Sequence, residues 1–364
     1  MLSNLLNFSG GPGALPPSVL EQTQCAIAAL PDTGLSILGM SHRSEWFKAL
    51  LQEAQDNIRS LLDVPDRYHI LFLQGGSSLQ FSMIPMNFAA AATAPAEFVA
   101  SGYWSRKAIG EAKAVVNAHT VWDGAAGGYR NLPAWGDLER SARAPFFHYV
   151  SNETVEGLQF SGAPSAIGVP LIADMSSDFL SRRFDIGDYA MVYAHAQKNL
   201  GPAGVTVALI DEALLSRIPS GLPPMLDYRT HVEHGSNYNT PPVFSIYVLN
   251  LVSRWLRDEV GGLDAIEHLN QRKAGMLYQA LERQRQMIEV HADVAARSSM
   301  NVAFRFRDES LQGLFLAEAN AAGFSGLEGH RSIGGLRASL YNAVSEEAVR
   351  QLADHVDDFA RRHG

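Results

Sequence analysis

The sequence predicts an α/β protein with a mostly parallel central sheet flanked by helices and a smaller α+β domain at its C-terminal end. In most of the chain, apolar runs of strand length alternate with segments of helical periodicity, the order typical of parallel sheets with right-handed crossovers. After about residue 260 this alternation becomes sparser. We therefore expect a large domain over residues 16–259, a small domain over residues 260–364, and an N-terminal arm, residues 1–15, packed near the small domain.

Composition narrows the class of protein. The 364 residues are 46% hydrophobic, which is ordinary for a soluble chain with a large core. A net charge of −9 argues against general nucleic-acid binding, because such proteins need a basic face. Cys25 is the single cysteine, and the sequence contains no signal segment and no apolar run of membrane-spanning length. We expect a cytoplasmic protein with neither nucleic acid nor membrane as a partner.

The first elements of the chain place two cationic side chains at a helix start. A glycine-rich loop at residues 7–13 precedes a helix after Pro17, and Ser41 or Ser44 can cap a second helix that runs to about Leu62. His42 and Arg43 then lie at the positive end of the helix dipole. That position suits an anion site better than it suits stability.

A glycine pair follows the first predicted strand. Residues 68–73 form a buried apolar run, and Gly75, Gly76, Ser77 and Ser78 come between it and a helix beginning near Leu79. Strand, glycine pair and helix make a phosphate-binding cup, because backbone N–H groups and the helix dipole face the same anion. An ordinary tight turn is the alternative interpretation.

Three further strands predict loops at the same edge of the sheet. They cover residues 98–100, 146–150 and 169–173, and we expect a loop and then a helix after each one. Trp104, Thr154 and Asp174 lie in or just beyond these loops. Because ligands bind at the carboxyl ends of parallel strands, one pocket could contain all three. Trp104 could equally be a core aromatic residue, and Asp174 a helix cap.

Lys198 lies in a glycine- and proline-rich turn between apolar runs at residues 189–193 and 205–210. A lysine held in such a turn can be desolvated, which lowers the pKa of its amine and makes it a nucleophile able to form a Schiff base. The alternative, a solvated surface lysine, is the commoner case for this residue type. The other loops predicted at this edge of the sheet favour a nucleophilic Lys198 over a surface lysine.

The rest of the chain has fewer strands. His231 and His234 lack a third ligand at suitable spacing, so we expect no metal site. The remaining elements are expected as helices at residues 243–256, 263–285, 311–322 and from Ser345, and strands at residues 300–306 and 336–340.

Together these residues fit pyridoxal phosphate. Asp174 would face the pyridine nitrogen and Trp104 would stack on the ring. Thr154 would contact a ring substituent, and Lys198 would form the covalent link and then move a proton. The cup residues would hold the phosphate, namely Gly76, Ser77 and Ser78 with Gln197 close by.

Several stretches also resemble the phosphoserine aminotransferase family, in the fold-type I superfamily of pyridoxal phosphate enzymes. They are residues 7–13, 39–47, 151–157, 173–177, 196–204, 239–242 and 329–343. The sequence departs from the family pattern at three positions. His195 replaces the usual glycine, Ser78 stands where many relatives have arginine, and Glu328 where a lysine is often found.

The resemblance implies a homodimer with shared active sites, in which the partner's Asn239 and Thr240 reach the cofactor phosphate. It implies transfer of the amino group of L-glutamate to 3-phosphohydroxypyruvate, giving O-phospho-L-serine and 2-oxoglutarate in serine biosynthesis. Many members also act in pyridoxine biosynthesis, forming 4-phosphohydroxy-L-threonine.

Both substrates are multiply anionic, and the sequence offers cationic side chains for them. We assign the α-carboxylate to Arg337, whose guanidinium can bind it through two hydrogen bonds. The phosphate or side-chain carboxylate falls to a second group, His42, Arg43, His330 and Arg331, with Ser9 lining the substrate side. An alanine–glyoxylate or serine–pyruvate aminotransferase would not need this second group. A non-catalytic pyridoxal phosphate sensor is a further alternative, although such proteins usually carry an added DNA-binding segment.

Overall fold

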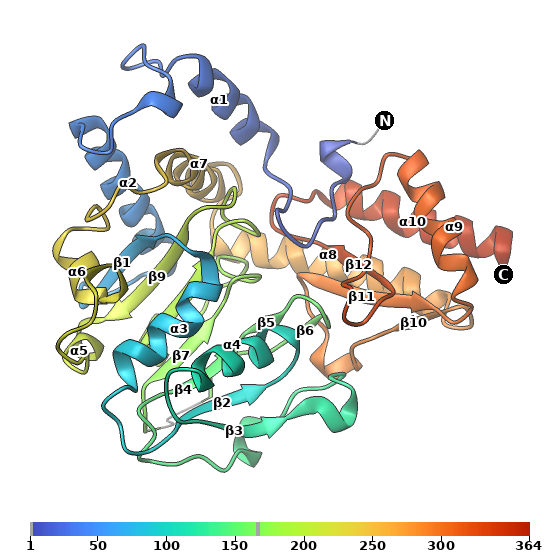
Figure 1. Cartoon of the computed structure of the whole chain (residues 1–364). Helices are drawn as coiled ribbons and strands as arrows, with labels where there is room; N and C mark the ends of the chain where they lie inside the picture. Colours follow the sequence, from blue (N-terminus) through green and yellow to red (C-terminus); the bar gives the residue numbers. More distant parts are fainter. Residues whose placement is uncertain (1–2, 165–167) are drawn as a thin grey trace.

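A seven-stranded sheet forms the centre of the protein in the computed structural model, which describes residues 3–164 and 168–364 (Figure 1). Its strand order is β1-β9-β8-β7-β4-β2-β3. The strands are β1 (Tyr68–Leu73), β2 (Ala96–Ala100), β3 (Ala118–Asp123), β4 (Phe147–Val150), β7 (Leu171–Asp174), β8 (Met191–His195) and β9 (Thr206–Asp211).

Helices cover both faces of this sheet (Figure 1). The helices before residue 260 are α1 (Pro17–Ala28), α2 (Glu45–Leu62), α3 (Gly76–Phe88), α4 (Tyr103–Lys113), α5 (Glu212–Leu215), α6 (Tyr228–Glu233) and α7 (Val243–Arg254), with a π-helical turn at Trp255–Glu259. Strand residues alternate between the two faces, as the period of a strand requires. In β8, Met191 and Tyr193 belong to the core beneath α3 and α4, whereas Val192 and Ala194 belong to the core beneath α2 and α7.

The sheet is mostly parallel, as predicted. Neighbouring strands from β3 through β2, β4 and β7 to β8 pair in parallel. Strand β9 lies antiparallel to both of its neighbours, β8 and β1. The chain reverses between β8 and β9 in the turn that contains Lys198, because only a few residues separate the two strands.

The predicted helices after residues 146–150 and 169–173 are wrong. Residues Asn152–Glu153 (β5) and Leu158–Gln159 (β6) form a short antiparallel hairpin instead, and turns follow Asp174. Gly157 takes a φ of +72° in this hairpin and packs against the carbonyl of Asn301, which no side chain at that position would allow. The sequence analysis also missed β3 and β10, whose residues are partly exposed edges.

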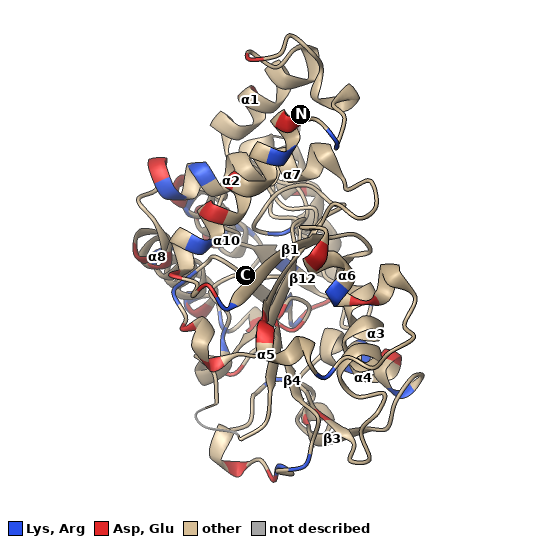
Figure 2. Cartoon of the chain, turned by 90° about the vertical axis from the view of Figure 1, so that its left-hand side faces the viewer, with Lys and Arg blue, Asp and Glu red and all other residues tan. Residues whose placement is uncertain are grey.

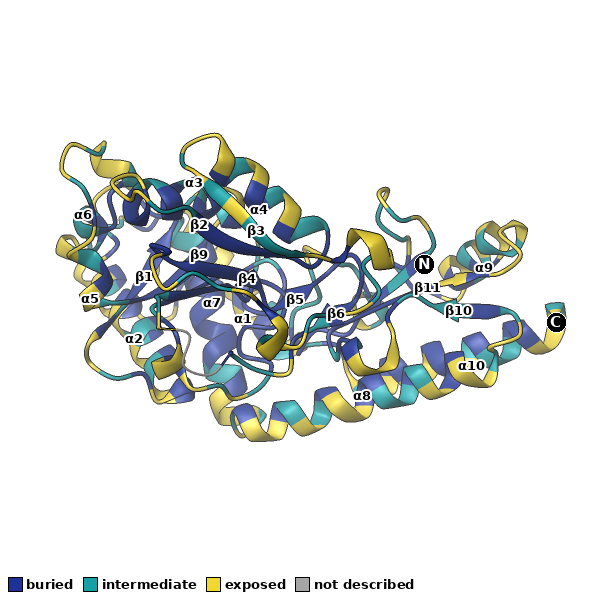
Figure 3. Cartoon of the chain, turned by 90° about the horizontal axis from the view of Figure 1, so that it is seen from below, coloured by how far each residue is buried: buried dark blue, intermediate teal, exposed yellow. Residues whose placement is uncertain are grey.

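The C-terminal part of the chain builds a second, three-stranded antiparallel sheet. Its elements are α8 (Leu263–Arg283), β10 (Ile288–Val290), β11 (Asn301–Phe306), α9 (Ser310–Ala321), β12 (Leu336–Ser339) and α10 (Glu346–His363). Helices α8 and α10 lie along each other (Figure 1), and buried and exposed residues alternate along them (Figure 3). Such amphipathic helices cover one side of a sheet while their other side meets solvent.

The N-terminal arm packs against this second sheet. The backbone N–H of Phe8 donates to Ser325, and that of Ser339 donates to the carbonyl of Phe8. The Phe8 side chain is fully buried in the same core as α8, β11 and α10. The glycine-rich segment that follows therefore passes directly over the carboxyl edge of the large sheet.

Acidic and basic residues are interspersed over the face shown in Figure 2. Within the described ranges, no helix combines the length and apolar character that crossing a membrane requires.

Candidate active site

Lys198 lies at the carboxyl edge of the large sheet, in the turn after β8. Its Nζ donates to Thr154 Oγ1 at 2.6 Å and lies 5.3 Å from the centre of the Trp104 ring, and the side chain is only 5% exposed. Burial lowers the pKa of Lys198 to about 8, whereas the negative charge of Asp174 raises it. The amine is thus much closer to its neutral, nucleophilic form than a surface lysine is.

Asp174 ends strand β7, beside Lys198. Its Oδ1 accepts a hydrogen bond from the backbone N–H of Ser176 at 2.8 Å and another from the Ser176 hydroxyl. Burial raises the pKa of Asp174 to about 6, and the bonds from Ser176 oppose this rise. The residues after Asp174 form turns, so the carboxylate caps no helix and is free to serve a ligand.

The predicted cup forms the start of α3. Gly75 and Gly76 take φ values of +88° and +66°, a region that favours glycine. The N–H groups of the first turn of α3 have no partners within the helix and point out of its N-terminus. Ser77 Oγ lies 2.6 Å from Ser176 Oγ, which links the cup to Asp174.

Lys107 is a cup residue that the sequence analysis missed. Its Nζ donates to Ser78 Oγ at 2.9 Å and lies 5.5 Å from the centre of the Trp104 ring. A positive charge therefore reaches the cup from α4, at the position where the sequence has serine rather than arginine. The signal was the three-residue spacing of Trp104 and Lys107 on one helix face.

Two buried carboxylates, also missed, hold the N-terminus of α4. Glu153 accepts from the backbone N–H groups of Trp104 and Ser105, each at 2.9 Å, and Glu156 accepts from that of Tyr103 at 2.9 Å. Burial and then the charge of Glu153 raise the pKa of Glu156 to about 8. The pair fixes the backbone that carries Trp104, because its carboxyl oxygens accept hydrogen bonds from three N–H groups at the start of the helix.

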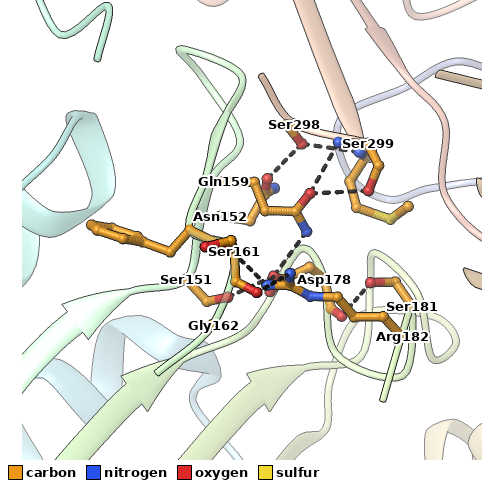
Figure 4. Close-up of polar contacts among 12 residues, drawn as sticks. Ser151, Asn152, Gln159, Ser161, Gly162, Asp178, Ser181, Arg182, Ser298 and Ser299 are labelled. Carbon is orange, nitrogen blue, oxygen red and sulfur yellow. Dashed lines mark hydrogen bonds and ion pairs between the residues drawn. The ribbon is translucent and has the colours of Figure 1, made fainter. Parts of the chain in front are cut away.

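A polar network joins the loop that carries Thr154 to the start of β11 (Figure 4). Asn152 Nδ2 donates to Asn301 Oδ1 at 2.8 Å, and Asn152 Oδ1 accepts from Ser298 Oγ at 2.5 Å. Ser151 Oγ donates to Asp178 Oδ2 at 2.6 Å, and the same carboxylate oxygen lies 3.6 Å from Arg182. The loop is therefore anchored from both parts of the chain.

Arg337 on β12 faces the same edge. It stands against Gly10 of the N-terminal arm, so closely that a side chain on Gly10 would collide with the guanidinium. Among the described residues, its buried Nε has no hydrogen-bond partner. Burial lowers the pKa of Arg337, and nearby Tyr341 and Glu156 counteract this. An anion is the natural partner for the unpaired Nε.

Of the other candidate substrate residues, His330 lies closest to this centre. Its ring centre is 4.6 Å from that of Tyr103, and burial followed by the charges of Arg337 and Arg331 lowers its pKa. Arg331 itself is exposed. Ser9 accepts a hydrogen bond from the N–H of Gly11 at 3.4 Å in the arm.

The remaining candidates lie in two neighbouring loops. Asn239 and Thr240 are exposed, as is Arg43. The carbonyl of His42 accepts a hydrogen bond from Asn237 Nδ2 at 2.9 Å, so the two loops are neighbours. No cluster of possible metal ligands occurs in residues 3–164 and 168–364.

This donor set fits pyridoxal phosphate. Gln197 lies in the Lys198 turn, where its carbonyl accepts from Gly13 and its side chain contacts Gly11. The buried amine, the aromatic face, the carboxylate and the helix N-terminus each match one part of the cofactor.

Comparison with known proteins shows which family the chain belongs to. The family model of class-V aminotransferases matches residues 5–352. The chain is 47% identical to phosphoserine aminotransferase of Geobacillus kaustophilus over 98% of both chains. It is similar to the solved phosphoserine aminotransferase from Bacillus circulans subsp. alkalophilus, with a TM-score of 0.95, 44% identity and 98% of both chains covered.

A PLP-bound phosphoserine aminotransferase from Trichomonas vaginalis is also similar, with a TM-score of 0.91 and 35% identity over 96% of this chain and 99% of that one. The cofactor is therefore pyridoxal phosphate and the enzyme a transaminase, as the residues and the resemblance predict. The chain belongs to the phosphoserine aminotransferase family of class-V aminotransferases.

Proposed function

We propose that the enzyme transfers the amino group of L-glutamate to 3-phosphohydroxypyruvate, giving O-phospho-L-serine and 2-oxoglutarate in serine biosynthesis. The same chemistry would form 4-phosphohydroxy-L-threonine in pyridoxine biosynthesis. One observation carries the proposal. The buried amine of Lys198 is close enough to Arg337 for that charge to lower its pKa, and it shares the Trp104 ring with Lys107, which reaches the cup.

Each residue then has a physical task. Bound pyridoxal phosphate supplies an electron-accepting ring. Asp174 places a negative charge opposite the ring nitrogen, Thr154 donates to or accepts from a ring substituent, and Trp104 limits the tilt of the ring. Lys198 holds the cofactor covalently and, once released, moves a proton at the substrate Cα. The N–H groups of Gly76 and Ser77, with Ser78 and Gln197, bind the phosphate.

The substrate is held by cations at both of its ends. Arg337 offers an unpaired buried donor that suits the α-carboxylate, and Gly10 leaves the guanidinium room. His330 and Arg331, joined by the partner subunit's His42 and the partner subunit's Arg43, would bind the phosphate or the side-chain carboxylate. Ser9 lines the substrate side of the site.

We further propose a cytoplasmic homodimer with shared active sites. The neighbouring loops around His42 and Asn237 support this, because they present Arg43, Asn239 and Thr240 at the surface of their own chain. The partner subunit's Asn239 and the partner subunit's Thr240 would complete the phosphate site. Residues 16–259 and 260–364 would act as large and small domains, with the arm, residues 1–15, packed near the small one.

A panel of half-reactions tests the substrate assignment. The purified holoenzyme is mixed with O-phospho-L-serine, L-glutamate, L-serine or L-alanine, and conversion of the bound cofactor to its amine form is followed by absorbance. We expect fast conversion with the first two, because each carries a second anion, and slow conversion with the others. Equal rates with alanine and phosphoserine would contradict the assignment and favour an alanine–glyoxylate aminotransferase.

Two variants separate the ends of the substrate. Arg337→Ala is expected to weaken binding of all four amino acids, because all have an α-carboxylate. Arg331→Ala is expected to weaken chiefly phosphoserine and glutamate. A uniform effect of Arg331→Ala would place that residue outside the phosphate site.

A further inference from the structure

His195 is a buried histidine without an evident role in the site described above. It ends β8, three residues before Lys198, and is 8% exposed. Its Nε2 is enclosed, and among the described residues it has no hydrogen-bond partner. Since burying a polar atom without a partner is unfavourable, an enclosed ring nitrogen indicates a partner that is not a side chain of this chain.

The alternation of β8 shows on which face the ring lies. Side chains two residues apart in a strand share a face, so His195 lies on the same face as Tyr193, under α3. Tyr193 contacts Phe81 of α3, with ring centres 6.4 Å apart. Strand β8 runs parallel to β1, and α3 returns antiparallel to both. The move from Tyr193 to His195 on β8 therefore corresponds to a move of one turn toward the N-terminus of α3, from Phe81 to Ser77.

A hydrogen-bond chain leads to the same place. The backbone N–H of His195 donates to Ser176 Oγ at 3.4 Å, and Ser176 Oγ lies 2.6 Å from Ser77 Oγ. His195 thus lies at the N-terminus of α3, where backbone N–H groups form the cup.

We propose that His195 Nε2–H donates a hydrogen bond to the phosphate of the cofactor. Burial, with a smaller effect of the Lys198 charge, lowers the pKa of His195, so the ring is neutral and carries its single proton on one nitrogen. A neutral donor adds a contact to the dianionic phosphate without adding a buried charge. The inference rests on the assignment of the α3 N-terminus as the phosphate cup.

Binding of two cofactor analogues to the apoenzyme tests this role. Pyridoxamine 5′-phosphate and pyridoxamine share the ring but differ in the phosphate, and both bind without a covalent bond to Lys198. Their dissociation constants are measured by quenching of tryptophan fluorescence. His195→Leu, which keeps a side chain of similar bulk without a donor, is expected to raise the constant for the phosphorylated analogue about tenfold and to leave that for pyridoxamine within about twofold.

Further variants keep the test decisive. His195→Gln retains a donor and is expected to recover most of the lost affinity, and His195→Gly replaces His195→Leu if the latter does not fold. His148→Gln is the matched control, because His148 is also buried but bonds Tyr193 and lies away from the cup. It should leave the ratio of the two constants unchanged.

Two results would overturn the proposal. Equal losses for both analogues in His195→Leu would show a structural role, and an unchanged constant for the phosphorylated analogue would show no contact. Ser78→Ala, which removes a cup hydroxyl, separates this failure from a failure of the cup. If Ser78→Ala weakens only the phosphorylated analogue while His195→Leu has no effect, the cup stands and the role of His195 falls.

Discussion

The amine of Lys198 provides a direct test of the site's electrostatics. Because burial lowers its pKa to about 8, Lys198 in the apoenzyme should hold a neutral amine at a pH where surface lysines are charged. We expect competitive acetylation of Lys198, followed by mass spectrometry, to titrate with a midpoint near pH 8. A midpoint near the ordinary lysine value would contradict the desolvation argument.

The same measurement on Asp174→Asn checks the cause of the shift. The Asp174 charge favours the protonated amine, so its removal should move the Lys198 midpoint to lower pH. A rise of the Lys198 midpoint in Asp174→Asn would mean that Asp174 does not act through its charge.

Lys107 supplies the cup with the charge that Ser78 lacks. We expect Lys107→Met to raise the dissociation constant of pyridoxamine 5′-phosphate about fivefold at low salt, and less at high salt. Ser78→Arg in the Lys107→Met background should restore the affinity, since it returns a cation to the same place. Salt-independent losses would indicate a packing role.

The residues that converge at the carboxyl edge could be predicted because each follows an apolar strand. Thr154, Trp104 and Lys198 lie within contact distance of one another for that reason. Glu153 and Glu156 could not be predicted, because their roles depend on how α4 docks against the hairpin. The spacing of Lys107 from Trp104 gave the helix face of Lys107 but not the cup as its target. The orientation of a helix is set by tertiary packing, which a sequence period does not specify.

The N-terminus of α4 makes the next prediction. Glu156 has a pKa of about 8, so it holds a proton at neutral pH and resembles a glutamine in charge. Glu156→Gln should therefore change the free energy of unfolding by less than about 1 kcal/mol below pH 4.5, where the unfolded chain also holds the proton, and should increase it near pH 7, where the unfolded chain has lost that proton. Chemical denaturation measures this, and a decrease near pH 7 would mean that Glu156 is ionised in the folded protein.

The contribution of Glu156 to the free energy of unfolding depends on pH, and the sign of this dependence is defined. The folded protein holds more protons on Glu156 than the unfolded chain between its ordinary pKa and about 8, so its contribution to stability falls as pH rises through that window. The difference in stability between the native chain and Glu156→Gln should follow this fall. If this difference does not change with pH, the pKa of Glu156 is not raised in the folded protein.

Among the elements, the long ones were predicted well and the short ones were not. Helix α8 and strand β1 have enough residues for a clear period. Hairpin β5–β6 has two residues in each strand, too few for any pattern, and is stabilised by buried polar contacts such as Asn152 with Asn301. In the described part of the chain, a hairpin and turns thus stand where simple alternation predicted two helices.

At the scale of the whole molecule, the arm links the two sheets through the active site. Phe8 is anchored in the core of the second sheet, and Gly10 and Gly11 then pass over Arg337 and Lys198. The sequence analysis expected the arm near the small domain but not its path over Arg337 and Lys198. Pairing between segments more than 300 residues apart leaves no local signal in either one.

Mixed dimers test whether the active sites are shared. Lys198→Ala removes the reactive amine, and the double variant Asn239→Ala, Thr240→Ala would remove the groups given to the partner. Each variant should be nearly inactive alone. In a mixed dimer one site has its own Lys198 and the partner subunit's Asn239 and the partner subunit's Thr240, so co-refolding equal amounts should restore about a quarter of native activity.

The result expected for the mixed dimers depends on where Asn239 and Thr240 lie on their own chain. Asn239 and Thr240 are exposed on their own chain, beside the loop of His42 and Arg43, whereas Lys198 is buried. If each chain completed its own site, every mixture would contain only damaged sites, and its activity would equal the mean of the two variants refolded separately. Activity well above that mean requires that one protomer supply groups to the cofactor of the other, which makes dimerisation a condition of catalysis.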